Sequence, residues 1–358
     1  REGEVIGYDG AIVTHNIPLE GLDLNRNFPA NWAPEGKQVG AGPVPLSEPE
    51  TRALGDFISS HRNIVIAVAG HTFSGILLRS GSNTPDQDIP VNDLRAYKKM
   101  GEKGTSLSGY PAVSIYHDFR YHPKQNIAGG FDWVYEHLGI YFWTIEYWAP
   151  HKAAGVDMTK TPYSDWLFDH EEEDDLAVFR FFDRESPGKA HVDWYEFEHP
   201  QLGTLEIGGW DVLNSFHNPP AHLLEKEIAC FPDWFVYQAL LTAKLALVEA
   251  SATRVGDRAF LVRLVVENDG YLSTAGSDKA RANETTREVV AEIHLPETAA
   301  LLRGKAWEEL GHLEGRVAMM ASPVFMATGF DAMDGRSSRA KVEWLVEAEP
   351  GTRPVSYT

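Results

Sequence analysis

The sequence has little cysteine and little positive charge for its size. A single cysteine, Cys230, among 358 residues excludes an intrachain disulfide and a zinc site built from several cysteines. The 32 basic residues are outnumbered by 52 acidic ones, which gives a formal net charge of −20. Because a field of that sign repels phosphate groups, we expect no nucleic acid as a partner.

Long apolar runs are also missing. The longest mainly apolar stretches, residues 64–69 and 235–248, are too short or too interrupted by polar residues to cross a bilayer, so we expect no membrane span. The chain is nevertheless 43% apolar, and its length predicts about two domains, each with its own core. The single cysteine leaves the compartment open; we favour a secreted or periplasmic location over a cytoplasmic one.

A capping motif predicts the first helix. Ser47 as N-cap, with Glu50 three residues later, has the pattern of a capping box and predicts a helix over about residues 48–60. The acidic run at residues 171–175 is typical of a solvated loop rather than of a site for a cation or a partner, and we assign it no function.

Two predicted strands end beside ionisable side chains. Residues 63–69 form a continuous apolar run, which predicts a strand buried on both faces. An aromatic-rich strand is expected over about residues 139–147. His71 directly follows the first strand and Glu146 lies near the end of the second. Since ligands of open α/β sheets bind beyond the carboxyl ends of the strands, both side chains lie at a candidate site.

The pattern of the sequence changes near residue 247. Apolar and polar residues then alternate in runs separated by Gly, Asn, Asp and Ser, at 260–266, 289–295 and 342–348. This alternation predicts a small all-β module, most simply a sandwich, after a helix-forming stretch at 231–247. We therefore divide the chain into an α/β domain, residues 1–246, and a β module, residues 247–358.

Three segments carry residue types suited to catalysis. Asn25 and Arg26 combine a guanidinium with an amide, which suits a carboxylate ligand; an ion pair of Arg26 with Asp23 is the structural alternative. His71 is either a zinc ligand or a hydrogen-bonded structural histidine. Glu146 is flanked by apolar residues, which favours a raised pKa and a role as general base, unless it belongs to a buried ion pair.

Taken together and in this order, the segments resemble the zinc metallocarboxypeptidases of the carboxypeptidase A and B family. The similar segments are Asp-Leu-Asn-Arg-Asn-Phe at 23–28, Leu-Ser-Glu-Pro-Glu-Thr at 46–51, His-x-x-Ser at 71–74, Gly-Gly-Phe-Asp-Trp-Val-Tyr at 129–135 and Gly-Ile-x-x-x-x-x-Glu at 139–146. The resemblance covers about residues 1–240, and the tail is similar to a subgroup with an extra β module. It implies a mixed-sheet α/β/α domain, one zinc ion and hydrolysis of the C-terminal peptide bond of a peptide with a free C-terminus.

The resemblance also implies roles for individual residues. Asn25 and Arg26 match the pair that holds the carboxylate of the substrate, and His71 matches a zinc ligand. Glu146 matches the general base that, together with zinc, activates a water molecule for attack on the peptide carbonyl.

Two aromatic residues complete the implied substrate site. Tyr116 matches the tyrosine that closes over the substrate, with Tyr121 as the competing choice. Phe131 lies in the neighbourhood that lines the specificity pocket, where an aromatic ring favours apolar substrate side chains over basic ones.

The zinc ligands of the family are incomplete in this sequence. The family has a His-x-x-Glu pair ahead of the Asn-Arg segment, and residues 1–21 contain none. His222 and Glu225 have this spacing, but they follow Glu146, and we interpret the match as a coincidence. Because a catalytic zinc needs about three protein ligands, we expect the other two, and an arginine that polarises the carbonyl, upstream of Arg1.

Two other functions stay open. An amidase or a hydrolase of peptidoglycan peptides on the same scaffold would have an altered carboxylate clamp, whereas Asn25 and Arg26 are both present. A metal-free binding protein without enzymatic activity would keep the fold alone. Zinc content distinguishes this last alternative from either enzyme.

Overall fold

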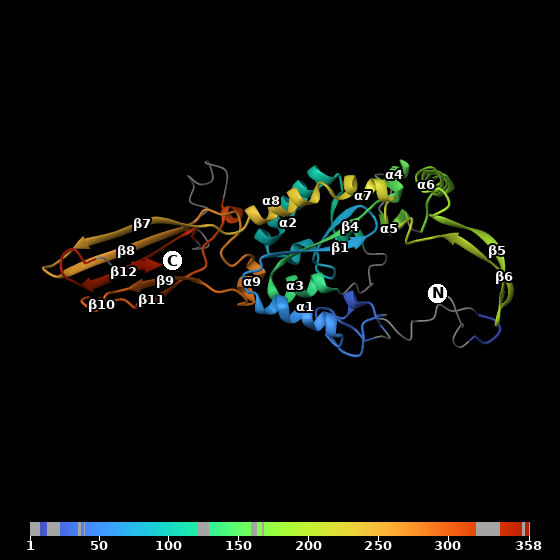
Figure 1. Cartoon of the computed structure of the whole chain (residues 1–358). Coiled ribbons are helices and arrows are strands. Elements are labelled where there is room, and N and C mark those ends of the chain that lie inside the picture. The colour runs from blue at the N-terminus through green and yellow to red at the C-terminus, as the bar shows by residue number, and fades with distance from the viewer. Residues whose placement is uncertain are drawn as a thin grey trace.

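The computed structural model describes residues 8–12, 22–34, 37–38, 40–119, 129–158, 163–166, 168–319, 337–352 and 355–357. An α/β part occupies the middle of the elongated molecule, with a β module at one end and a two-stranded ribbon at the other (Figure 1). Among the described helices, none is both long and apolar enough to cross a membrane.

A four-stranded mixed sheet forms the centre of the α/β part. Its strands are β1 (Ile66–Thr72), β2 (Ile76–Arg79), β3 (Ala112–Ser114) and β4 (Tyr141–Tyr147), in the order β1-β4-β2-β3. β1 is parallel to β4, β2 is antiparallel to β4, and β3 is parallel to β2. The mixed sheet agrees with the predicted fold class.

Helices cover both faces of this sheet (Figure 1). α1 (Pro49–Ser60) and α3 (Gly130–Leu138) pack on one face, in a core that includes Ile58, Trp133 and Phe142. α2 (Val91–Ser108) and α8 (Phe231–Leu240) pack on the other face, in a core that includes Tyr97, Trp143 and Trp234. The predicted α/β/α arrangement is confirmed.

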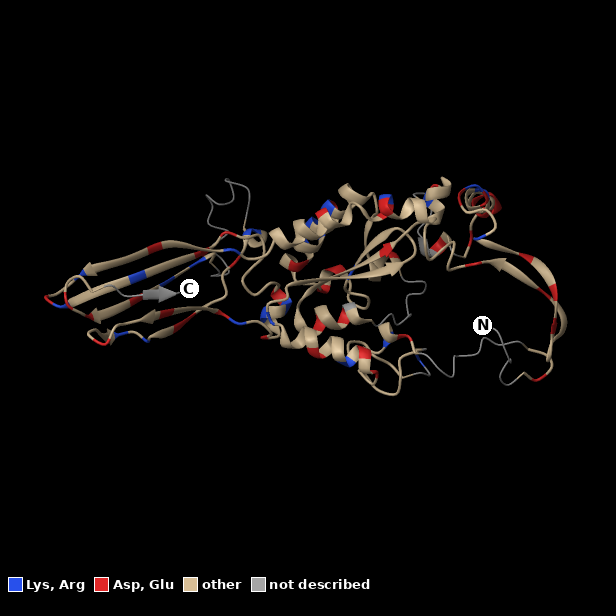
Figure 2. Cartoon of the chain, in the orientation of Figure 1, with Lys and Arg blue, Asp and Glu red and all other residues tan. Residues whose placement is uncertain are grey.

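Smaller elements lie between β4 and α8. They are the helices α4 (Pro150–Ala154), α5 (Tyr163–Trp166), α6 (Glu172–Glu185) and α7 (Ala221–Ile228), and the antiparallel strands β5 (His191–His199) and β6 (Gly203–Trp210). β5 and β6 form the ribbon that extends away from the β module (Figure 1). Residues 191–210 of this ribbon contain acidic residues and no Lys or Arg (Figure 2).

The β module consists of two sheets. β7 (Leu245–Arg254), β8 (Ala259–Asn268), β10 (Ala300–Arg303) and β12 (Arg339–Glu347) form one, and β9 (Val289–His294), β11 (Trp307–Gly311) and β13 (Val355–Tyr357) form the other. Leu264, Ile293 and Trp344 belong to the apolar core that the module buries. The all-β module predicted from the alternation is confirmed, and the helix before it ends at Leu240 rather than at Leu247. A short helix, α9 (Asp278–Ala282), lies between β8 and β9.

The capping box predicted at Ser47 is wrong. The N-cap of α1 is Glu48, whose side chain makes no capping hydrogen bond. The Ser47 hydroxyl instead accepts from Asn27 Nδ2 at 2.9 Å and donates to Glu48 Oε1 at 2.7 Å. Asn27 Oδ1 accepts from the Glu48 amide at 3.3 Å and from the Thr51 hydroxyl at 2.7 Å. A buried side chain from outside the helix therefore replaces the local cap.

The acidic run also differs from its prediction as a loop. It begins helix α6, with Glu171 as N-cap and four acidic residues in the first turn. Negative charge is favoured at this end of a helix because the unpaired amide groups there carry partial positive charge. Asp174 Oδ2 also accepts from Trp166 Nε1 at 2.8 Å, and Asp175 Oδ2 lies 3.1 Å from His170 Nε2.

Candidate active site

His71 and Glu146 lie opposite each other on the neighbouring parallel strands β1 and β4. His71 Nδ1 is 3.9 Å from Glu146 Oε1. His71 lies inside β1, one residue before its end, and not beyond it as predicted. Among the described strands, β1 lies at the edge of its sheet and is partly exposed, whereas the sequence pattern predicts a strand buried on both faces. The two ionisable side chains thus meet at the end of β4.

In an ion pair the pKa of the carboxyl group falls and the pKa of the imidazole rises; in this pair both pKa values shift the other way. Glu146 is 8% exposed, and burial raises its carboxyl pKa to about 7. Burial also lowers the pKa of the His71 imidazole, and the positive charge of Arg26 lowers it further, against a smaller opposing effect of Asp23. The site therefore holds a neutral imidazole beside a carboxyl group that titrates near neutral pH, which is the range suited to a general base.

A short 3-10 turn, η1 (Leu24–Arg26), presents the Asn-Arg pair. The backbone amide of Asn25 donates to Asp23 Oδ1 at 3.0 Å. Asn25 Oδ1 accepts from the amide of Gly130, the first residue of α3, at 2.9 Å. Arg26 Nε lies 3.8 Å from Asp23 Oδ2, with the two side chains 28% and 50% exposed. The ion pair considered as the structural alternative is thus present, long and partly solvated.

Two buried polar residues support these groups in ways that the sequence did not predict. Asn27 Nδ2 donates to the carbonyl groups of Ala41 at 2.8 Å and Val44 at 3.1 Å, which fixes the turn before it. Asp132 accepts from the Ser82 amide at 3.0 Å, and burial raises the pKa of Asp132 to about 6. Their position in the sequence could have indicated both residues: Asn27 lies in the Asn-Arg-Asn segment and Asp132 in the Gly-Gly-Phe-Asp-Trp segment.

The structure does not bring Tyr116 to Glu146. Tyr116 lies in the π-helix η3 (Ile115–Phe119), directly after β3. The register pairs Ser114 of β3 with Arg79 of β2, and Arg79 with Trp143 of β4. Trp143 precedes Glu146 by three residues, roughly 10 Å along a strand. Because β3 runs antiparallel to β4, η3 begins at the opposite end of the sheet from Glu146.

The other implied substrate residues lie nearer to the site or outside the description. Phe131 is in the first turn of α3, next to the glycine that donates to Asn25. Tyr121 lies outside the described residues. A cavity of about 230 Å³ adjoins the site, and its lining includes Asn25, His71, Phe28, Leu54, Ile58 and Phe142.

The described residues do not complete a zinc centre. Nowhere in the described ranges do three His, Cys, Asp or Glu side chains gather in a group that could hold a metal ion, whereas a catalytic zinc needs about three protein ligands. His71 would contribute one ligand. His222 lies on the exposed surface of α7, where its Nε2 is 3.1 Å from Glu185 Oε2.

In comparison with known proteins, the two parts of the chain match different families. Residues 9–161 match the model of a family described as zinc carboxypeptidase, so this part is similar to a carboxypeptidase. Residues 244–358 match a family described as a domain of unknown function.

Curated relatives agree with the first match. Mast cell carboxypeptidase A of Mus musculus is 33% identical over 132 residues, which cover 35% of this chain and 31% of the relative. Carboxypeptidase B of Bos taurus is 30% identical over 139 residues, which cover 35% of this chain and 32% of the relative. The chain therefore spans about a third of the length of these relatives. A solved structure of thrombin-activatable fibrinolysis inhibitor matches at 24% identity over 48% of this chain and 44% of that chain, with a TM-score of 0.29.

These matches confirm the family predicted from the motifs. Residues 9–161 are thus similar to the carboxypeptidase A/B-like family of zinc carboxypeptidases.

Proposed function

We propose that this chain supplies the carboxylate-binding and proton-transferring groups of a carboxypeptidase-type peptide hydrolase, which acts on peptides with a free C-terminus. The observation that carries the proposal is the meeting of His71 and Glu146, 75 positions apart in the sequence, at 3.9 Å, within reach of the charge of Arg26. Each of these residues lies within residues 9–161, which match the family model, and the curated relatives are carboxypeptidases.

Arg26 is suited to bind the terminal carboxylate of the peptide. Its planar guanidinium offers two parallel hydrogen bonds to a carboxylate, which a lysine ammonium does not. One of its present partners, the carboxylate of Asp23, is 3.8 Å away and 50% exposed, and such surface pairs stabilise a protein only slightly. A substrate carboxylate can therefore displace it. Asn25 is anchored through Oδ1 to Gly130, which leaves its amide nitrogen for the same carboxylate.

Glu146 is suited to move the proton. With a pKa of about 7, a large fraction of the group is a carboxylate at neutral pH and accepts a proton from water, and its conjugate acid is strong enough to pass that proton to the leaving amine. The zinc that the family implies would have His71 as one ligand, and the described residues alone do not complete its site. The steps assigned to this chain are therefore carboxylate binding and proton transfer.

Calorimetric titration tests the carboxylate site directly. An N-acetylated dipeptide with a free carboxylate should bind to the chain more tightly than the same dipeptide as its C-terminal amide. Arg26→Ala should weaken binding of the acid by about 10- to 100-fold, the effect of losing charge-assisted hydrogen bonds, and leave binding of the amide unchanged. Arg62→Ala, which removes an exposed arginine after α1, serves as the matched control. Equal binding of acid and amide to the wild type would contradict the proposal.

Zinc-loaded protein that also carries the two further zinc ligands implied by the family resemblance separates the remaining functions. Hydrolysis of the acid, and not of the amide, is the expected result. Hydrolysis of the amide as fast as the acid would favour an amidase instead. Tight binding of the acid without hydrolysis would favour a binding protein.

A further inference from the structure

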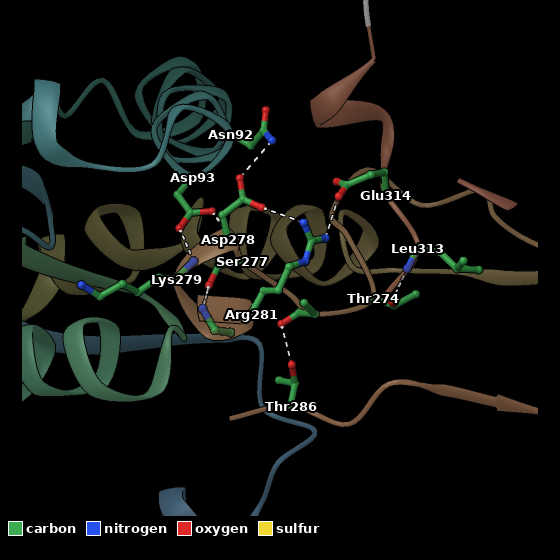
Figure 3. Close-up of polar contacts among 12 residues, drawn as sticks. Asn92, Asp93, Thr274, Ser277, Asp278, Lys279, Arg281, Thr286, Leu313 and Glu314 are labelled. Atoms are coloured by element: carbon green, nitrogen blue, oxygen red, sulfur yellow. Dashed lines mark hydrogen bonds and ion pairs between the residues drawn. The ribbon is translucent and has the colours of Figure 1, made fainter. Parts of the chain in front are cut away.

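One of the contacts between the β module and the α/β part is made by a short segment that leaves the sandwich between β8 and β9. Residues 273–285, which contain α9, form this segment, and α9 lies beside α3 in Figure 1. Within the module, Arg281 holds the segment: its guanidinium pairs with Asp278 at 3.2 Å and with the buried Glu314 at 2.7 Å (Figure 3). The segment is thus fixed to the sandwich on one side and meets the α/β part on the other.

Asp93 of α2 is the centre of this contact. Its side chain is fully buried. Its two oxygens accept from the backbone amides of Asp278 at 2.7 Å and Lys279 at 3.0 Å, at the start of α9 (Figure 3). They also accept from the hydroxyl groups of Tyr135 in α3 at 2.9 Å and Tyr141 in β4 at 3.1 Å. One carboxylate therefore ties the module to α2, α3 and β4 together.

The same segment supplies the C-terminal cap of α3. The last carbonyl groups of a helix have no partner within the helix. Asn283 Nδ2 donates to the carbonyl groups of Glu136 at 2.8 Å and His137 at 3.0 Å. The Thr285 hydroxyl donates to the carbonyl of Leu138 at 2.7 Å, and the Ser277 hydroxyl donates to that of Gly139.

Gly139 shows how closely the two parts approach each other. It ends α3 with a φ of 70°, in the left-handed region, and a Cβ atom there would lie 2.1 Å from the amide nitrogen of Ala280 in α9. No side chain fits in that space. The contact between α3 and α9 is therefore a backbone contact, which allows little sliding of one against the other.

The elements held in this way carry the candidate site at their other ends. α3 begins at Gly130, whose amide bonds to Asn25. β4 begins at Tyr141, which bonds to Asp93, and ends one residue after Glu146. A shift of α3 and β4 at the ends that contact the module would therefore move Gly130, which holds Asn25, and Glu146.

We propose that residues 273–285 of the β module position the candidate site, because they cap α3 and hold β4 through Asp93. These are positioning residues, and none of them touches the substrate. The inference rests on the proposed function for its effect on binding, but the contact itself is testable without it.

Hydrogen exchange of the whole chain tests the contact. Asn283→Asp removes the donors to two α3 carbonyl groups and places a negative charge at the negative end of that helix. Asn218→Asp is the matched control, because it makes the same change at an exposed asparagine whose Nδ2 donates to the Leu213 carbonyl at 2.9 Å, away from the contact. We expect exchange at Gly139 and Ile140 to rise about tenfold in Asn283→Asp, with a rise also at Gly130. A rise confined to Gly139 and Ile140 would overturn the positioning role.

Dipeptide binding tests the consequence for the site. Asp93→Asn replaces one acceptor oxygen with an amino group, which then faces two of the four donors. Asp233→Asn removes the same charge from the equivalent third position of α8. Measured well below the melting temperature of each variant, the affinity for the free-acid dipeptide should fall at least about tenfold in Asp93→Asn and in Asn283→Asp, and stay at the wild-type value in the two controls. A lower melting temperature with unchanged affinity would reduce the segment to a purely structural role.

The two failures are distinguishable. If the wild type binds no free-acid dipeptide, the proposed function fails, and the exchange rates at Gly130 still decide whether the module positions α3. If the wild type binds the dipeptide and all variants bind it equally, the positioning role fails alone.

Discussion

β4 and β12 are both interior strands rich in apolar residues, but they bury their side chains differently. In β4 every residue except the last is buried, on both faces of the strand. In β12 buried and exposed residues alternate, because one face of the strand contacts the core and the other contacts water. Each strand contains a glutamate: Glu146 is buried in β4, whereas Glu343 is exposed in β12, where Lys341 Nζ lies 3.3 Å and Arg263 Nε 3.8 Å from its Oε1.

The difference shows how one residue type acquires two roles. An exposed carboxylate such as Glu343 keeps its hydration and contributes little to stability. A buried carboxylate such as Glu146 loses that hydration, which destabilises the folded protein unless the group is protonated. A carboxylate buried in this way is therefore a candidate for a chemical role.

The largest expected effect is on catalysis. In the zinc-loaded full-length protein, with the two further zinc ligands that the family resemblance implies, Glu146→Gln should lower kcat/KM for an N-acetylated dipeptide by about 10²- to 10⁴-fold, because the amide cannot accept the proton. Glu343→Gln makes the same change in β12 and should leave kcat/KM within about twofold of wild type. Steady-state kinetics of both variants make this comparison, and equal rates for Glu146→Gln and wild type would remove Glu146 from the mechanism.

The second effect is on the pH dependence of stability. The pKa of Glu146 is raised from 4.5 to about 7, so the folded state binds this proton more tightly than the unfolded state does. Its contribution to stability is complete below pH 4.5 and is lost as the pH rises through 7. Between pH 5 and pH 8, the free energy of unfolding of wild type should therefore fall relative to that of Glu146→Gln by on the order of 1–3 kcal/mol. Urea unfolding at the two pH values measures the difference; a constant difference would mean that Glu146 has an ordinary pKa.

The smallest effect is the loss of the surface charge pairs of β12. Glu343→Gln should change the free energy of unfolding by no more than about 0.5 kcal/mol. Since salt screens exposed charges, the change should shrink further in about 0.5 M salt, where the Debye length is only a few ångströms. The same urea titrations measure this change in the free energy of unfolding. If it depended on pH as strongly as that of Glu146→Gln, the two glutamates would not differ in the way that their burial predicts.

Local patterns predicted much of the fold. β4, β8, β9 and β12 lie where the aromatic run and the alternating runs predicted strands, because the period of side-chain burial along a strand is written in consecutive residues. The strand patterns likewise placed His71 and Glu146 at one edge of the sheet, and the structure adds that their strands are neighbours. The capping box at Ser47 failed because Asn27, 20 positions earlier, competes for the same hydroxyl. The acidic run failed as a loop because its helix depends on partners such as Trp166.

By itself, the sequence determined the mixed α/β class, the β module and the identity of the groups at the candidate site. These depend on residue type and short-range spacing. Only the tertiary structure decided that Asp93 accepts from α9 and that the module caps α3. It also decided that η3, which contains Tyr116, begins at the opposite end of the sheet from Glu146. Those features depend on strand direction and on contacts between residues up to 186 positions apart. No local pattern encodes such contacts, because each partner is satisfied only when the two parts of the chain are packed together.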